Sequence, residues 1–192
     1  HIFLSFGDKE ITIGNFIADS IRANKFQHLP TKVQKGIKLH RHIDTYTDAH
    51  SIPKISSRRL HANYSHYSRV IVDIYYDHFL AKNWSKYSDT PLDIFVEDFY
   101  DLLEDNYEIL PEGVKRMMPY MISDNWLYNY SKMEGIGNVL NGMNRRTKNK
   151  SKMNFAIIDL EEHYDSFEKE FTEFFEELIT FSKHKYISLF SK

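Results

Sequence analysis

The stretch LEEHYDSFEKEFTEFFEEL, Leu160 to Leu178, has the most regular pattern in the chain. Leucine and aromatic residues recur there every three or four positions, and Glu and Lys fill most of the positions between them. Such spacing puts the apolar side chains on one side of an α-helix. The stretch therefore predicts a long amphipathic helix that packs on a core. Its apolar positions are Leu160, Tyr164, Phe167, Phe171, Phe174 and Leu178.

The composition extends this prediction to the whole chain. The 192 residues are 42% hydrophobic and 15% aromatic, which is enough to form the core of one ordinary domain. Seven Gly and five Pro, against thirteen Tyr and fourteen Phe, favour long regular elements with few tight turns. We expect an all-α protein, with a single compact domain over residues 1–192 and about six to eight helices.

Apolar periodicity and capping residues predict where the other helices lie. We expect the first to begin at Asn15, as its N-cap, and the second to run from about residue 31 to His50. The remaining helices are expected over residues 54–63, 67–84, 90–110, 114–130 and 131–141.

Charge and composition exclude several classes of function. A formal net charge of −2 and a pI near 6.6 give no general attraction to nucleic acid or to an anionic membrane. Without cysteine there are no disulfides or thiolate zinc sites, so a metal would bind to His, carboxylates and water. No apolar run approaches the roughly 20 residues that span a bilayer, and no signal-peptide pattern opens the chain. We expect a cytoplasmic protein.

The segment KLHRHIDTYTDAH, residues 38–50, holds most of the candidate metal ligands. On a helix, His40, Asp44 and Asp48 fall within an arc of about 80°, whereas His42 points to the opposite side. Their i, i+4, i+8 spacing lets neighbouring side chains converge on one ion. The alternative is a solvated polar face or a hydrogen-bonded His–Asp pair.

A second cluster interrupts the apolar helix VIVDIYYDHFLAKNW, where Asp73, Asp77 and His78 stand among large apolar residues. A buried carboxylate without a partner is costly, so something must compensate these charges. The partner could be a basic residue such as Arg41, or a divalent cation shared with His40.

Asp19 is a third candidate. Its expected place in the first turn of a helix would favour a negative charge by about 0.3–1 kcal/mol. The Gly14–Asn15 pair before it predicts a turn that would present a helix N-terminus, which can bind phosphate. We find no dinucleotide fingerprint, P-loop or nucleophile elbow.

Five motifs taken together resemble one known family. They are GNFIAD (14–19), GIKLHRHIDTYTDAH (36–50), YYDHFLAKNW (75–84), NVLNGM (138–143) and DLEEHYD (159–165). In this order and spacing they resemble the acyl carrier protein phosphodiesterases over nearly the whole chain. The resemblance implies an all-helical, HD-domain-like hydrolase. Such enzymes use a divalent ion, typically Mn²⁺, to hydrolyse the phosphodiester between 4′-phosphopantetheine and a serine of holo acyl carrier protein.

The resemblance also implies roles for single residues. Those matching the family's metal-site motifs are His1, His40, Asp44 and Asp77. Asp19 is expected to bind the metal or to activate water, His78 to act as general acid and Arg41 to contact the phosphate, with Asp48 near the substrate. The chain nevertheless lacks the His-Asp dipeptide that gives HD domains their name.

The tract NRRTKNKSK, residues 144–152, concentrates positive charge in a chain that is slightly acidic overall. Carrier proteins are acidic, so Arg145, Arg146 and Lys148 are candidates for binding this partner. The alternative is a solvated, disordered loop. Arg58 and Arg59 form a second basic candidate.

Three functional hypotheses remain. The chain could be a carrier-protein phosphodiesterase, or a related hydrolase of a nucleotide or another small phosphodiester. It could also be a catalytically silent helical module that binds carrier protein or metal. The sequence leaves the oligomeric state undetermined.

Overall fold

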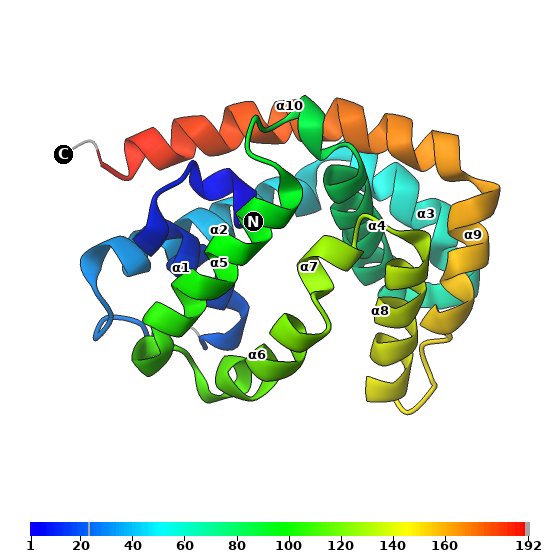
Figure 1. Ribbon diagram of the computed structural model, residues 1–192. Helices are drawn as coiled ribbons and strands as arrows, with labels where there is room; N and C mark the ends of the chain where they lie inside the picture. The colour runs from blue at the N-terminus through cyan, green and yellow to red at the C-terminus, as the bar shows by residue number, and fades with distance from the viewer. Residues whose placement is uncertain (23, 191–192) are drawn as a thin grey trace. The chain divides into compact units, whose positions relative to one another are not determined.

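The computed structural model describes residues 1–22 and 24–190, and within these ranges it contains α-helices and short 3-10 helices but no strand (Figure 1). The predicted all-α class is confirmed. The α-helices are α1 (Lys9–Ile17), α2 (Thr31–Ala49), α3 (Ser51–Tyr64), α4 (Ser68–Lys82), α5 (Leu92–Asp105), α6 (Glu112–Ser123), α7 (Trp126–Asn129), α8 (Met133–Arg146), α9 (Ala156–Glu162) and α10 (Tyr164–Ser188).

The chain divides into two compact units, each built from segments that are distant in sequence. Unit 1 comprises His1–Ala49, Glu97–Asp124 and Glu176–Lys192, and unit 2 comprises His50–Val96 and Asn125–Phe175. The expectation of one domain over residues 1–192 stays a prediction.

In unit 1, α1 and α2 meet backbone to backbone. A Cβ atom added to Gly14 of α1 would lie 2.0 Å from the carbonyl oxygen of Val33, and one added to Gly36 of α2 would lie 2.3 Å from that of Ile11. Both distances are far below van der Waals contact, so only glycine fits at either position. Apolar side chains on both helices, such as Ile11 and Ile37, are fully buried around this contact.

The first helix begins earlier than expected. Asp8 is its N-cap, and the Asp8 carboxylate accepts a hydrogen bond of 3.2 Å from the backbone N–H of Ile11. The prediction that Asn15 caps the helix is wrong, because Asn15 lies inside α1 and is fully buried. A Gly–Asn pair is typical of turns, but here Gly14 allows α1 to pack closely against α2.

Two other boundaries also differ from the sequence-based expectation. Helix α3 begins at Ser51 because His50 caps it, its Nδ1 accepting a hydrogen bond of 3.2 Å from the N–H of Ile52. The expected helix over 114–130 is split into α6 and α7 at Asn125, which adopts a left-handed conformation with φ 46°. With α9 and α10 also separate, the described residues contain more helices than expected.

Unit 2 contains the first part of the long helix predicted from Leu160 onward. Phe167 and Phe171 of α10 are buried, and their rings pack against Tyr75 and Phe79 of α4. The predicted packing role is confirmed. Leu160 is also buried but belongs to α9, because the helical run is interrupted at His163.

A polar network fastens α10 to α3 within unit 2. The guanidinium of Arg59 donates two hydrogen bonds to the Glu170 carboxylate, at 2.5 and 2.9 Å. Ser56, which is fully buried, donates a third at 2.5 Å and also bonds the Tyr76 hydroxyl. Burial would raise the pKa of Glu170, but the bonds from Arg59 and Ser56 outweigh it and lower that pKa.

The Glu170 network predicts a loss of stability in acid. A carboxyl group with a lowered pKa stabilises the fold above its unfolded value, here about 4.5, and this contribution is lost as the pH falls further. We expect Glu170→Gln to lower the free energy of unfolding at pH 7 by about 1.5–3 kcal/mol and to flatten its fall between about pH 5 and 3. Urea denaturation at several pH values measures both. The exposed Glu173→Gln on the same helix should change little, and parallel pH curves for Glu170→Gln and wild type would contradict the prediction.

The close contact of α1 with α2 predicts that a Gly→Ala substitution has opposite effects on stability at two helical positions. Gly14→Ala should destabilise the protein by about 1–3 kcal/mol or more, because the new methyl group collides with backbone. Gly137→Ala on α8 meets no atom within 4 Å and should stabilise by up to about 1 kcal/mol. Thermal denaturation distinguishes them, and a neutral Gly14→Ala would refute the close contact.

Candidate metal centre

His40 is the buried residue of the candidate site in unit 1. It lies on the side of α2 that also buries Val33 and Ile37, and its side chain is only 5% exposed. Its Nε2 lies 3.1 Å from Oδ2 of Asp44, one helical turn further on. His40 and Asp44 therefore lie together as their spacing predicts, and their role as metal ligands stays a prediction.

Asp19 reaches the same nitrogen from another element. It belongs to the short 3-10 helix η2 (Ala18–Ser20) that follows α1, and its Oδ1 lies 3.1 Å from Nε2 of His40. The expectation that Asp19 follows an open helix N-terminus suited to phosphate is wrong, because α1 ends just before it. Asp19 is brought to His40 by the close contact of α1 with α2, and 85% of its side chain is exposed.

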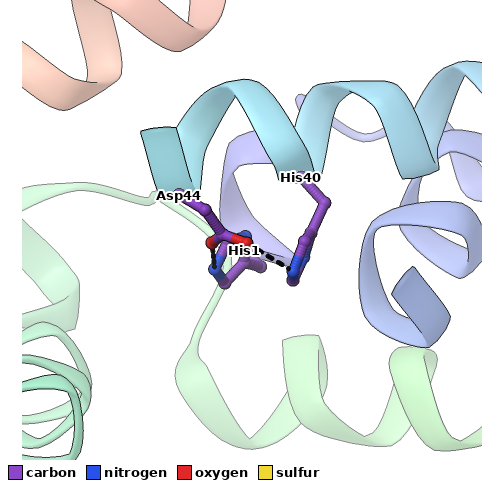
Figure 2. Close-up of side chains that lie close together, drawn as sticks. All are labelled: His1, His40 and Asp44. Carbon is purple, nitrogen blue, oxygen red and sulfur yellow. Dashed lines mark ion pairs between the residues drawn. The ribbon is translucent and has the colours of Figure 1, made fainter. Parts of the chain in front are cut away.

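His1 completes the cluster. Its ring stacks on that of His40, with the centroids 4.0 Å apart, and its Nε2 lies 3.3 Å from Oδ1 of Asp44. Figure 2 shows the Asp44 carboxylate facing both histidines, so that each of its oxygens pairs with one ring.

The charges in this cluster determine the protonation of His40. Burial would lower the pKa of His40, but its hydrogen bonds with Asp19 and Asp44 raise that pKa to about 9. Without an ion, the ring therefore favours the cationic form at neutral pH, and an ion bound to Nε2 would have to replace the proton there. The other ring nitrogen, Nδ1, is buried without a hydrogen-bond partner among the described residues.

The donor atoms suit a divalent cation. One ligand atom each from His1, His40 and Asp44 lies within 4.8 Å of the others, and Asp19 adds a carboxylate beside them. Imidazole nitrogen and carboxylate oxygen are the donors that Mn²⁺, Fe²⁺ and Zn²⁺ accept in proteins. His40 is buried while Asp44 and Asp19 are open to solvent, so a bound ion would keep positions for water or substrate.

Two further candidates on α2 lie outside this cluster. Asp48 is exposed one turn beyond Asp44 and is not part of the donor group in the described residues. The guanidinium of Arg41 lies 4.9 Å from the centre of the Phe26 ring. Their roles in binding substrate stay predictions.

Asp77 and His78 lie on α4 in unit 2. Asp77 is solvent-accessible, yet surrounding protein desolvates it enough to raise its pKa. Its assignment as a metal ligand stays a prediction, because the ligands brought together by the structure all lie in unit 1.

His78 is buried and both of its ring nitrogens have partners. Nδ1 lies 2.7 Å from the Tyr130 carbonyl oxygen, and Nε2 lies 2.7 Å from the Tyr164 hydroxyl. A carbonyl oxygen only accepts, so Nδ1 carries the proton and Nε2 accepts from Tyr164. Burial lowers the pKa of His78 and favours this neutral form. The geometry gives His78 a structural role in unit 2, and its role as general acid stays a prediction.

The basic tract of unit 2 is an ordered turn rather than a disordered loop. Arg145 and Arg146 end α8, and the following residues wrap around Asn144. The Ser151 hydroxyl, which is buried, donates to the Asn144 side chain at 3.1 Å, and the Asn149 N–H donates to the Asn144 carbonyl at 2.9 Å. This network exposes the cationic side chains Arg145, Arg146, Lys148, Lys150 and Lys152.

In the second basic candidate, only one of the two arginines is exposed. Arg58 is exposed, whereas Arg59 is committed to Glu170.

Comparisons with known proteins agree with the motif pattern. The acyl carrier protein phosphodiesterase of Escherichia coli (strain SE11) is 32% identical over 191 residues, covering 96% of each chain. Those of Photorhabdus laumondii and Pectobacterium atrosepticum are 30% and 28% identical, over 96% and 95% of this chain and 94% and 95% of their own lengths. No solved structure matches the chain.

These relatives are named as one class of enzyme, the phosphodiesterases. The family model described as acyl carrier protein phosphodiesterase matches residues 1–178, and this chain belongs to that family. None of the helices within the described residues is long and apolar enough to cross a membrane.

Proposed function

We propose that this protein hydrolyses the phosphodiester joining 4′-phosphopantetheine to a serine of holo acyl carrier protein, and so releases apo carrier protein. We further propose that the reaction depends on a divalent ion, Mn²⁺ being the first candidate, and that it takes place in the cytoplasm. The observation that carries the proposal is the convergence of His1, Asp19, His40 and Asp44 in a member of this family.

The chemistry of the substrate explains the need for such a site. A phosphodiester repels nucleophiles by its negative charge, and its alkoxide leaving group is poor. A metal ion bound here would lower the pKa of a coordinated water and neutralise charge on the phosphoryl oxygens.

Different residues of the chain would have different roles in the reaction. His1, His40 and Asp44 would hold the ion. The role of Asp77 as a further ligand stays a prediction from the family resemblance. Asp19, whose carboxylate is mostly exposed, would orient the attacking water and accept its proton. Arg41 would steady the phosphate.

The departing serine oxygen needs a proton, which we assign to His78. Because Nε2 of neutral His78 accepts from Tyr164 in the structure, that assignment requires the imidazolium form of His78. Its Nε2–H would give a proton to the Tyr164 oxygen while the Tyr164 hydroxyl gives its own proton to the departing serine oxygen. An HD-type ancestry remains part of the proposal, although the chain lacks the His-Asp dipeptide.

The basic turn of residues 144–152 would bind the carrier protein. Its side chains carry a local positive charge on a chain of net charge −2. Complementary charge mainly raises the association rate, in a manner that salt weakens.

A mass-spectrometric time course of holo acyl carrier protein with Mn²⁺ tests the reaction. The wild type should remove the phosphopantetheine mass, and Asp19→Ala and Asp44→Ala should not. His42→Ala is the matched control, because His42 is exposed on the same helix outside the cluster. Unchanged holo protein would refute the proposal, and turnover of small phosphodiesters instead would favour the related hydrolase.

Metal binding gives a separate prediction. Asp44→Asn should weaken Mn²⁺ binding by at least about tenfold, since losing even a supporting residue of a metal site costs that much. Asp48→Asn removes a like charge one turn along α2 and should leave the affinity near that of wild type. Electron paramagnetic resonance of free Mn²⁺ measures both. Equal losses in the two variants would indicate a general charge effect.

The proposed binding surface for the carrier protein, the basic turn of residues 144–152, gives another testable prediction. Replacing Arg145 and Arg146 with Glu should raise KM for holo carrier protein about tenfold at low salt, with kcat little changed, and the difference should shrink as salt is added. Lys169 and Lys183, exposed cations on α10, supply a control pair of charge reversals. An unchanged KM would exclude this surface from substrate binding.

A further inference from the structure

Asn15 of α1 contacts His1 through both ends of its side chain. The amide Nδ2 donates a hydrogen bond of 2.8 Å to the backbone carbonyl of His1, and Oδ1 lies 3.1 Å from the ring Nδ1 of the same residue. Asn15 is fully buried. Its side chain also donates to the Ser5 hydroxyl at 3.1 Å, and that hydroxyl lies 3.4 Å from the His1 carbonyl.

These contacts fix the orientation of the Asn15 amide. A carbonyl oxygen can only accept, so the atom facing the His1 carbonyl must be the amide nitrogen. The reversed amide would place two oxygens 2.8 Å apart and lose the bond. The atom facing the His1 ring is therefore the amide oxygen, which accepts.

The amide orientation in turn fixes the His1 ring. Because Oδ1 of Asn15 only accepts, Nδ1 of His1 must carry a proton. In the neutral ring, Nε2 then bears the lone pair. Nε2 is the nitrogen that lies 3.3 Å from Asp44. In the metal-free cluster a proton on Nε2 would pair with that carboxylate, and an ion bound there would take the place of that proton.

We infer that Asn15 is a positioning residue that holds His1 in the Nδ1–H tautomer and so makes it a metal ligand through Nε2. The inference rests on the proposed function for the identity of the group that His1 binds. Metal-ligating histidines commonly donate their second ring nitrogen to such a partner, which sets the tautomer and the ring orientation.

The location of Asn15 supports this role. Asparagine is a poor residue for a helix interior and is costly to bury without partners. A neutral amide also satisfies both the His1 ring and the His1 carbonyl without adding a third carboxylate beside Asp19 and Asp44. His40 has no comparable partner, since its Nδ1 is unbonded within the described residues.

The first test needs no substitution at Asn15. Long-range ¹H–¹⁵N spectra of the metal-free 192-residue chain report histidine tautomers, and comparison with His1→Gln assigns the His1 signal. At a pH above the titration of that ring, we expect the Nδ1–H form. The Nε2–H form, or an even mixture, would overturn the inference.

The second test measures Mn²⁺ affinity in Asn15→Leu, which keeps the shape of the side chain and removes its hydrogen bonds. We expect the Kd to rise about 10- to 100-fold. Gln34→Leu is the matched control, because Gln34 also donates its amide to backbone carbonyls in unit 1, those of Gln27 and Leu29, away from the cluster. It should lose stability and keep the wild-type Kd.

The outcomes separate this inference from the proposed function. An Asn15→Leu variant that binds Mn²⁺ as tightly as wild type overturns the positioning role and leaves the phosphodiesterase proposal standing. A wild type that binds no Mn²⁺ refutes the metal site and with it the ligand role of His1. The tautomer spectrum still decides whether Asn15 sets the ring.

Discussion

The close contact between α1 and α2 is the constraint on which the candidate site depends. Gly14 and Gly36 let the two backbones touch, and no other residue fits at either position. Asn15 directly follows Gly14, and Asp19 stands just past the end of α1, so both are carried to α2 by the same contact. His40 stands four residues beyond Gly36. One helix pair thus brings together side chains that are far apart in sequence.

The sequence predicted the helical class and half of the cluster for sound physical reasons. Residues four apart on a helix share a face, so the pairing of His40 with Asp44 follows from spacing alone. The apolar period of α10 likewise predicts Phe167 and Phe171 in the core. Such inferences succeed because they depend on the geometry of a single helix.

What the sequence could not supply depends on contacts between elements. Asparagine commonly caps helices, so Asn15 was expected at the start of one. Only the contact with the neighbouring helix shows that Gly14 and Asn15 lie inside α1. Asp19 belongs to the cluster, but the expected reason, an open helix N-terminus, was wrong. His1 was a candidate ligand only because of the resemblance to a family, since it lies outside the periodic patterns of the helices. Its buried partner Asn15 was missed as a functional residue, and the polar type of Asn15 within the apolar run of α1 was the available signal.

The ordered turn after α8 has a consequence for selectivity. Asn144 and Ser151 fix the backbone beneath Lys148 and Lys152, both of which adopt left-handed conformations. A flexible basic loop can mould itself to many anions but loses conformational entropy with each one it binds. Here the hydrogen bonds of Asn144 hold the backbone, so the positions from which the cationic side chains extend are set before any encounter. For the carrier protein proposed to bind here, affinity would then depend on how well its acidic groups match these backbone positions.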